Sequence, residues 1–265
     1  MGCAYPRPTG LTTTCAGPAL RARMIAAAPA APAHRLPAGR PAIAFFDLDK
    51  TLIGINSAQV WLRAELRAGL VRRRDAARGA VWIGLYHAGF ARLDAAVRDA
   101  ALAVAGAEVA PYAARSDRFW AEVVLPSLRP GARAAVEAHR AAGERLALIT
   151  SSSQFLAGPA AAALGLDHAL SNVLLVDGDR FTGRMAEPLC FGAGKVAHAE
   201  ALAAETGHSL ADCAFYTDSY SDLPLMQRVG RPVAVHPDPR LRRAAQRLGW
   251  PVVDWGPPAA SARAR

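Results

Sequence analysis

The sequence predicts an α/β fold, in which a parallel sheet forms the core and a helical segment is inserted after the first strand. Short apolar runs that end in polar residues recur along the chain, as expected of strands buried on both faces. These runs span 42–46, 145–149, 214–216, 233–235 and 252–253. Because helix-like patterns separate them, and strands that alternate with helices form parallel sheets, we expect a Rossmann-like core.

The order of the elements brings polar residues to one edge of this sheet. The first strand ends directly at Asp47. Helices are predicted over 130–142, which begins with Pro130 and ends before Gly143, and over 195–206. Ligands of such sheets bind outside the carboxyl ends of the strands, so the polar residues that follow the strands should form one pocket.

The spacing between the first two strands indicates an insertion. Asp47 and Thr150 lie 103 residues apart, whereas one crossover unit needs about 30. The stretch 57–128 is rich in Ala, Leu and Arg and has no strand signals, so we expect a helical cap over the pocket. The 45 residues from Thr150 to Lys195 are enough for a helix, a strand and the turn at Asp177-Gly178, but not for a second cap.

The predicted domains are an α/β core of residues 41–56 and 129–256, the cap, and two tails. Residues 1–40 contain six prolines and no acidic residue, so we expect a disordered basic tail. It lacks the continuous apolar segment of a secretory signal, which leaves open a transit peptide and a start at Met24. Residues 257–265 are expected to form a short flexible tail.

Composition excludes several classes of protein. Apolar residues make up 52% and charged residues 20%, which rules out a disordered chain or a disulfide-stapled miniprotein. The longest stretch without full charges in the first half, 79–91, is too short to cross a bilayer, so we expect no membrane partner. The four cysteines form no CxxC pair, which favours a reducing compartment such as the cytoplasm.

The net charge of +9 does not indicate a nucleic-acid-binding surface. Five arginines lie in the first 40 residues, and Arg263 and Arg265 lie at the other end, which leaves +2 for the middle of the chain. The best internal cluster, 72–74, is typical of a solvated helix end. We therefore expect no nucleic-acid partner.

Two aspartates follow the first strand, in Asp47-Leu48-Asp49-Lys50-Thr51-Leu52. A carboxylate at a strand tip can attack phosphorus to form an aspartyl-phosphate, which divides a hard hydrolysis into two easier displacements. The second acid can protonate the departing alkoxide and later take a proton from the attacking water. Aspartate is also common as a cap of turns, so this pair alone leaves a structural role open.

Phosphoryl transfer also needs cations and hydrogen-bond donors around the equatorial oxygens. Thr150 ends its strand with a hydroxyl, and the backbone amides of Ser151 and Ser152 follow it, although an ordinary helix N-cap would look the same. Lys195 follows Gly192-Ala193-Gly194 at the start of a helix, where a cation opposes the helix dipole. This unfavourable position favours a functional lysine.

Asp218 follows the third strand, and Asp222 lies four residues further on. Mg²⁺ prefers a few carboxylates together with phosphate oxygen and water in an octahedral array. Asp47, Asp218 and the carbonyl of Asp49 can supply such ligands. Asp222 can serve as a ligand, as an orienting group, or as the N-cap of a helix from Leu223.

In this order, the four stretches resemble the motifs of the haloacid dehalogenase-like phosphohydrolases, in particular the phosphoserine phosphatase-like branch with a helical cap after the first motif. The resemblance covers about 42–255 and rests on Asp47-x-Asp49-x-Thr51-Leu52, Thr150, Gly194-Lys195, and Asp218 with Asp222. It implies that Asp47 is the nucleophile and Asp49 the acid/base. It further implies that Thr150 and Lys195 bind phosphate, and that Asp47, Asp49 and Asp218, with Asp222 as a further candidate, surround Mg²⁺.

Gly54-Ile55-Asn56-Ser57 and other stretches resemble a less characterised bacterial subgroup, some relatives of which act on histidinol phosphate. In phosphoserine phosphatases an acidic residue nine positions beyond the nucleophile contacts the substrate, and here that position is Asn56, which counts against phosphoserine itself. We expect a small phosphate ester of an amino acid or amino alcohol, and a monomer or homodimer. Candidate substrate-binding residues are Asn56, Ser57, Arg98 and Ser151.

The main alternative is a signalling receiver module, which also pairs a phosphorylatable aspartate with a hydroxyl and a lysine. The inserted cap and Asp49 argue against it, because an acid two residues after the nucleophile promotes turnover. Asp49-Lys50-Thr51 also suggests an ion-pump core, but spanning segments are not seen and Leu52 replaces the pump's glycine. A noncatalytic binding module would require vestigial carboxylates, yet all of them are present.

Overall fold

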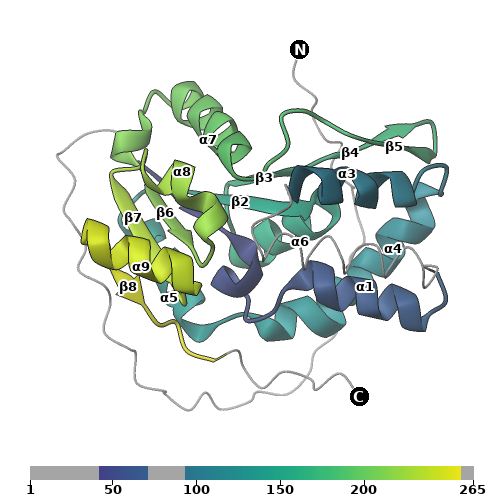
Figure 1. Ribbon diagram of the computed structural model, residues 1–265, viewed down its shortest axis with the longest axis horizontal. Helices are drawn as coiled ribbons and strands as arrows, with labels where there is room; N and C mark the ends of the chain where they lie inside the picture. The colour runs from purple at the N-terminus through teal and green to yellow at the C-terminus, as the bar shows by residue number, and fades with distance from the viewer. Residues whose placement is uncertain (1–41, 71–92, 258–265) are drawn as a thin grey trace, which may run out of the picture.

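The computed structural model of the chain describes residues 42–70 and 93–257. Within these ranges, six strands form one parallel sheet in the order β3-β2-β1-β6-β7-β8 (Figure 1). The strands are β1 (Ile43–Phe46), β2 (Arg145–Ser153), β3 (His168–Asn172), β6 (Ala214–Thr217), β7 (Arg231–Val235) and β8 (Val252–Val253). This sheet confirms the α/β class predicted from the sequence.

The first strand lies in the middle of the sheet and is wholly buried. All four residues of β1 have an exposed fraction of 0%. Because successive side chains of a strand point to opposite faces, Ala44 and Phe46 join one apolar cluster while Ile43 and Phe45 join another. Burial on both faces requires the continuous apolar run by which this strand was recognised.

Helices cover both faces of the sheet (Figure 1). On one face, the described helices are α5 (Pro130–Ala141) and α6 (Gln154–Leu164). On the other face they are α7 (Ala193–Glu205), α8 (Leu223–Met226) and α9 (Pro239–Leu248). The helices predicted over 130–142 and 195–206 correspond to α5 and α7.

The residues of the predicted cap lie to one side of the sheet (Figure 1). Their described helices are α1 (Ser57–Arg67), α3 (Leu93–Ala103) and α4 (Val109–Phe119). The chain leaves and re-enters the core through two segments that pair with each other. The Gly54 amide donates to the carbonyl of Ser127 at 2.8 Å, and the Arg129 amide donates to the carbonyl of Leu52 at 2.9 Å. Such a narrow junction suits a separate cap, whose boundaries stay a prediction.

An antiparallel hairpin, which was not predicted from the sequence, lies apart from the main sheet. It consists of β4 (Leu174–Asp177) and β5 (Arg180–Met185), joined at the predicted turn Asp177-Gly178. Phe181 of β5 is buried against Ala101 of α3. One strand was predicted in a stretch that forms three, because the hairpin strands bury few side chains and give a weak apolar pattern.

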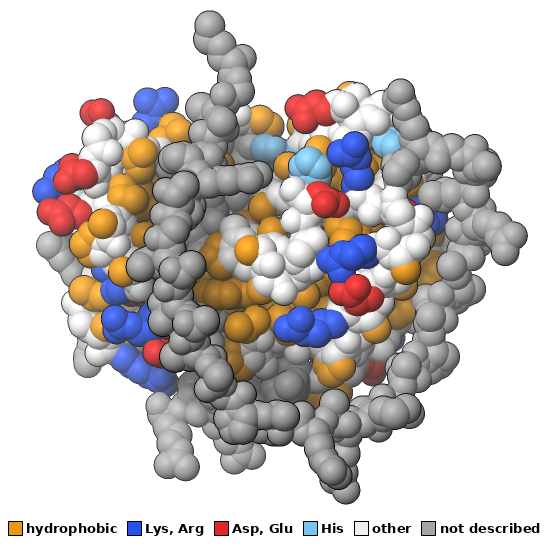
Figure 2. Space-filling model, turned by 180° about the vertical axis from the view of Figure 1, so that it is seen from behind, with side chains coloured by type: hydrophobic (Ala, Val, Ile, Leu, Met, Phe, Trp, Pro, Cys, Tyr) orange, Lys and Arg blue, Asp and Glu red, His pale blue; other side chains and the backbone are white. Residues whose placement is uncertain are grey.

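Some predictions concern residues outside the described ranges. They are the tail 1–40 with Met24, the stretch 79–91, the arginines 72–74, and residues 258–265. In the ranges that are described, none of the helices is long and apolar enough to cross a membrane. On the face seen in Figure 2, Lys and Arg side chains are interspersed with Asp and Glu among apolar residues.

Candidate active site

Three neighbouring strands carry the predicted chemistry at their carboxyl ends. Asp47 follows β1, Thr150 lies in the second half of β2, and Asp218 follows β6. The Asp47 amide donates to the carbonyl of Tyr216 at 2.9 Å, so backbone pairing continues to the predicted nucleophile. The exposed fractions of Asp47, Thr150 and Asp218 are 6%, 1% and 8%, which places all three where water is largely excluded.

Lys195 joins two of the predicted aspartates. Its Nζ lies 2.8 Å from Asp47 Oδ1 and 2.8 Å from Asp222 Oδ2, and Asp222 Oδ2 also accepts a hydrogen bond from the Thr217 hydroxyl at 2.7 Å. Burial alone would lower the pKa of Lys195, but the two adjacent carboxylates outweigh burial and keep its pKa above the ordinary value. The lysine is therefore a fixed cation beside Asp47.

The loop before Lys195 is held by a close backbone approach. Gly194 lies in the first turn of α7, and a Cβ atom there would be only 1.9 Å from the carbonyl oxygen of Leu189. Asn172 holds the same loop by accepting from the Cys190 amide at 2.8 Å, and it donates to the carbonyl of Ser151 at 2.7 Å. Asn172 thus connects the loop that carries Lys195 to the end of β2.

Asp49 lies in the turn Leu48–Leu52, where Lys50 adopts a left-handed conformation with φ of 56°. Asp49 Oδ1 accepts from the backbone N–H of Ser57 at 2.5 Å, and Oδ2 accepts from the hydroxyl of Ser152 at 3.2 Å. Burial raises the pKa of Asp49, although these hydrogen bonds oppose the shift. A raised pKa suits a carboxyl group that must give and take a proton.

Thr150 is not the N-cap of the following helix, because β2 continues to Ser153, which is the N-cap of α6. The Thr150 hydroxyl accepts from the Ser152 amide at 3.1 Å. Ser151 lies between them and is only half-buried. Thr150 and Ser151 therefore lie at the same sheet edge as Asp47, which is compatible with the predicted phosphate contacts.

The acidic groups around Asp47 fit a divalent cation. Burial raises the pKa of Asp47 to about 7 and that of Asp218 to about 8, and repulsion between carboxylates adds to both shifts. No three Asp, Glu, His or Cys side chains of the described ranges converge in a metal cage. Mg²⁺ does not need one, since it is usually held by one or two carboxylates, water and substrate phosphate. Asp222 contacts Lys195 and Thr217, and its role as a metal ligand stays a prediction.

The predicted substrate-binding residues have varied environments. The Asn56 side chain caps α1 by accepting from the Gln59 amide at 3.0 Å. Ser57 has an exposed fraction of 0%. Arg98 on α3 forms an ion pair with Glu187, and both side chains are half exposed or more. That Asn56, Ser57, Arg98 and Ser151 select the substrate stays a prediction.

Sequence reasoning missed the side-chain contacts that three hydroxyl residues make with the predicted catalytic side chains. Ser152 contacts Asp49, Thr217 contacts Asp222, and the Thr51 hydroxyl lies 3.4 Å from Asp218 Oδ1. Each is a hydroxyl residue one or two positions from a motif aspartate or from Thr150. That proximity is a usable signal, although Ser and Thr are too common at strand ends for it to identify partners.

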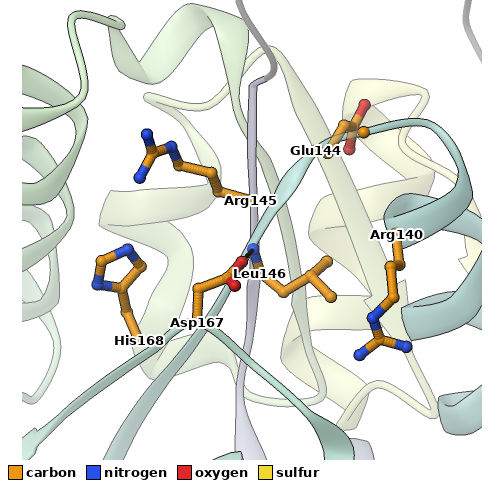
Figure 3. A pocket seen from close by; sticks show the side chains of 7 residues that line it. Arg140, Glu144, Arg145, Leu146, Asp167 and His168 are labelled. Carbon is orange, nitrogen blue, oxygen red and sulfur yellow. Dashed lines mark hydrogen bonds between the residues drawn. The ribbon is translucent and has the colours of Figure 1, made fainter.

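A surface pocket of about 610 Å³ lies at the other edge of the sheet, near the amino ends of β2 and β3 (Figure 3). Its polar groups are largely paired within the protein. Asp167 accepts from the Leu146 amide, Arg140 donates to the carbonyls of Leu164 and Gly165, and Glu144 pairs with His139. None of the residues that line this pocket belongs to the Asp47 cluster, so a substrate bound there would not reach Asp47.

A family model described as haloacid dehalogenase-like hydrolase matches residues 44–227. The chain belongs to this family. A phosphoserine phosphatase of Mycobacterium tuberculosis is 37% identical over 224 residues, which cover 81% of this chain and 71% of that protein. A histidinol-phosphatase of Neisseria meningitidis is 31% identical over 218 residues, which cover 80% of this chain and 98% of that protein.

A solved structure has the same fold at comparable identity. It is a protein with unknown function from Bordetella pertussis, 32% identical, with a TM-score of 0.75 over 82% of this chain and 100% of that one. The family resemblance inferred from the four motifs is confirmed. The chain is a phosphatase of the haloacid dehalogenase-like type.

Proposed function

We propose that this phosphatase is a Mg²⁺-dependent phosphomonoesterase that works through an aspartyl-phosphate on Asp47. The observation that carries the proposal is the buried Lys195, whose Nζ lies 2.8 Å from Asp47 Oδ1 at the carboxyl edge of the sheet. The lysine opposes the rise in the pKa of Asp47 that burial causes, orients this carboxylate, and places a positive charge where phosphoryl oxygens would lie. The Thr150 hydroxyl supplies a hydrogen-bond donor, whereas the Ser152 amide already donates to that hydroxyl.

The reaction divides into two displacements at phosphorus. In the first, a carboxylate oxygen of Asp47 attacks phosphorus, the ester P–O bond breaks, and its electron pair goes to the leaving oxygen, which takes a proton from Asp49. In the second, water attacks the same phosphorus and gives its proton to Asp49. The bond from phosphorus to Asp47 breaks, which releases phosphate and restores both carboxyl groups.

Asp47, Asp218 and the backbone carbonyl of Asp49 would hold the metal. Mg²⁺, when bound, neutralises charge on the transferring phosphoryl group. Asp222 would then mainly hold Lys195, because its carboxylate is the second one that lies 2.8 Å from the lysine Nζ. Asp218 and Asp222 thus have different tasks, metal binding and lysine binding, although both follow β6.

For the substrate, we infer a small phosphate ester of an amino acid or amino alcohol. Two relatives are named for phosphoserine and histidinol phosphate, and both compounds are phosphate esters of an alcohol that also bears an amine. Asn56 offers no carboxylate to an ammonium group, and its side chain already caps α1. This arrangement favours a substrate other than phosphoserine within that class.

The test combines one variant with a substrate panel. Asp47→Asn should lower hydrolysis of 4-nitrophenyl phosphate by at least about 10³-fold without changing the fold, because loss of a nucleophile costs up to about 10⁶-fold elsewhere. Ranking phosphometabolites by kcat/KM would then identify the substrate. Full activity of the Asp47→Asn variant would refute the mechanism.

A further inference from the structure

Ser152 contacts the side chain that the mechanism uses as acid and base. Its hydroxyl donates to Asp49 Oδ2 at 3.2 Å, while the Ser57 amide donates to Asp49 Oδ1 at 2.5 Å. The hydroxyls of Ser57 and Ser152 lie 3.3 Å apart. The Ser57 side chain also hydrogen-bonds to Asp49, so both serines contact the carboxyl group directly. We call this ring of three residues the serine clasp.

The serine clasp joins three parts of the chain that are distant in sequence. Asp49 lies in the turn after β1, Ser152 lies near the carboxyl end of β2, and Ser57 is the first residue of α1. Ser57 is fully buried, whereas Asp49 and Ser152 are partly buried. The orientation of the Asp49 carboxyl group therefore depends on where α1 lies relative to the core.

We propose that Ser152 is a positioning residue for Asp49, and that Ser57 makes this positioning depend on the placement of α1. The inference rests on the proposed function, because it requires Asp49 to protonate the leaving group. A carboxyl group turns easily about its last side-chain bond. Hydrogen bonds to both oxygens, from two different elements, fix its plane and leave the remaining lone pairs for the substrate.

The nature of the leaving group separates positioning from a general structural role. Nitrophenolate leaves 4-nitrophenyl phosphate without a proton, whereas the alkoxide of an alkyl phosphate such as phosphoserine needs one. In first-turnover measurements, Ser152→Ala should slow alcohol release from the alkyl ester by about 10- to 100-fold, a part of the ~10²–10⁴-fold that acid/base catalysis contributes. Nitrophenolate release should change by less than about 3-fold, because Asp49 is not needed for that step.

Matched variants complete the experiment. Ser152→Thr keeps the hydroxyl and should restore the alkyl ester rate, whereas Ser57→Ala should show the same selectivity in weaker form. Ser153→Ala is the control, because the Ser153 side chain bonds to Tyr112 instead of Asp49, and both rates should stay unchanged. In a background of Asp49→Asn, Ser152→Ala should cause no further loss, since it acts through Asp49.

Two kinds of failure can be told apart. If Asp47→Asn is inactive but Ser152→Ala slows both esters equally, or slows neither, the serine clasp has no positioning role. A further loss in the Asp49→Asn background would overturn it as well. If Asp47→Asn stays active, the proposed function fails and the serine clasp with it. Should Ser152→Ala not fold, Ser57→Ala tests the same carboxyl group, because it removes the Ser57 side-chain contact with Asp49 and keeps the backbone donor.

Discussion

Lys195→Met tests the charge balance on which the proposed mechanism depends. Methionine keeps the apolar stem but removes the ammonium group that lies 2.8 Å from both Asp47 and Asp222. The exposed fractions of these carboxylates are 6% and 1%, so water cannot replace the lysine. The variant would leave two buried acids without a cation.

The loss of stability should be large and should depend on pH. Removing one partner of a buried ion pair costs about 3–5 kcal/mol. The pKa of Asp47 is already raised to about 7 by burial, and Lys195 opposes that shift, so its removal raises the pKa further. A carboxyl group whose folded pKa exceeds its unfolded value destabilises the folded state increasingly as pH rises from the unfolded to the folded pKa. The variant should therefore lose more stability at about pH 8 than at about pH 5.

Urea unfolding of the metal-free protein, with EDTA present, measures this difference. We expect Lys195→Met to lower the free energy of unfolding by about 3–5 kcal/mol at about pH 8, and by at least about 1 kcal/mol less at about pH 5. Arg228→Met is the matched control, because it removes an ion pair with Glu200 whose side chains are 57% and 45% exposed. Such surface pairs contribute about 0–1 kcal/mol.

Two results would refute this reasoning. If Lys195→Met lost no more stability than Arg228→Met, the lysine would not be balancing buried carboxylates. If the loss were the same at both pH values, the remaining acids would not be taking up protons in the folded state. A loss that did not depend on pH would also contradict the raised pKa of Asp47.

Three further predictions concern the metal and the loop before α7. Asp218→Asn should abolish the rise in Tm that Mg²⁺ gives the wild type and lower kcat by at least about 10²-fold; a retained Tm shift would contradict it. Mg²⁺ should stabilise the wild type more at about pH 8 than at about pH 5, because protons compete for Asp47 and Asp218; differential scanning fluorimetry showing a constant shift would disprove this. Gly194→Ala should cost about 1–3 kcal/mol in urea unfolding, since its Cβ would meet the Leu189 carbonyl oxygen at 1.9 Å. Gly158→Ala, where nothing lies within 4 Å, should be neutral or stabilising, and equal losses in the two variants would contradict the steric argument.

The sheet and the placement of the motif residues could be predicted from the sequence because both follow from local pattern. The buried strand before Asp47 is a continuous apolar run, and the rule that ligands bind at the carboxyl ends of parallel strands brings Asp47, Thr150 and Asp218 together without knowledge of the strand order. The observed order β2-β1-β6 makes them neighbours. Lys195 was identified by its unfavourable place at a helix start, which is also a local signal.

Contacts between distant segments could not be predicted in this way. The hydrogen bonds of Asp49 come from Ser57 and Ser152, which are 8 and 103 positions away in the sequence. Nothing in a run of serines after a strand shows which hydroxyl faces the acid. The hairpin β4–β5 was missed for a related reason, because Phe181 is buried by α3, an element far from it in the sequence. Tertiary packing decides both cases.

The helices α7 and α8 each have a residue near their start that weakens the helix, Lys195 and Asp222 respectively. The ion pair between these two residues explains why both are there. Lys195 stands in the first turn of α7, where a cation opposes the helix dipole at a cost of about 0.3–1 kcal/mol. Asp222 is the N-cap of α8, yet its side chain makes no capping hydrogen bond there, which forgoes about 1 kcal/mol. Each loss is smaller than the ~1.5–3 kcal/mol that a hydrogen bond to a charged group contributes, and Lys195 makes two of them. Because Asp222 gives up its cap to hold the lysine, and the lysine holds Asp47, departures from helix rules at these two positions indicate a chain of charges that ends at the proposed nucleophile.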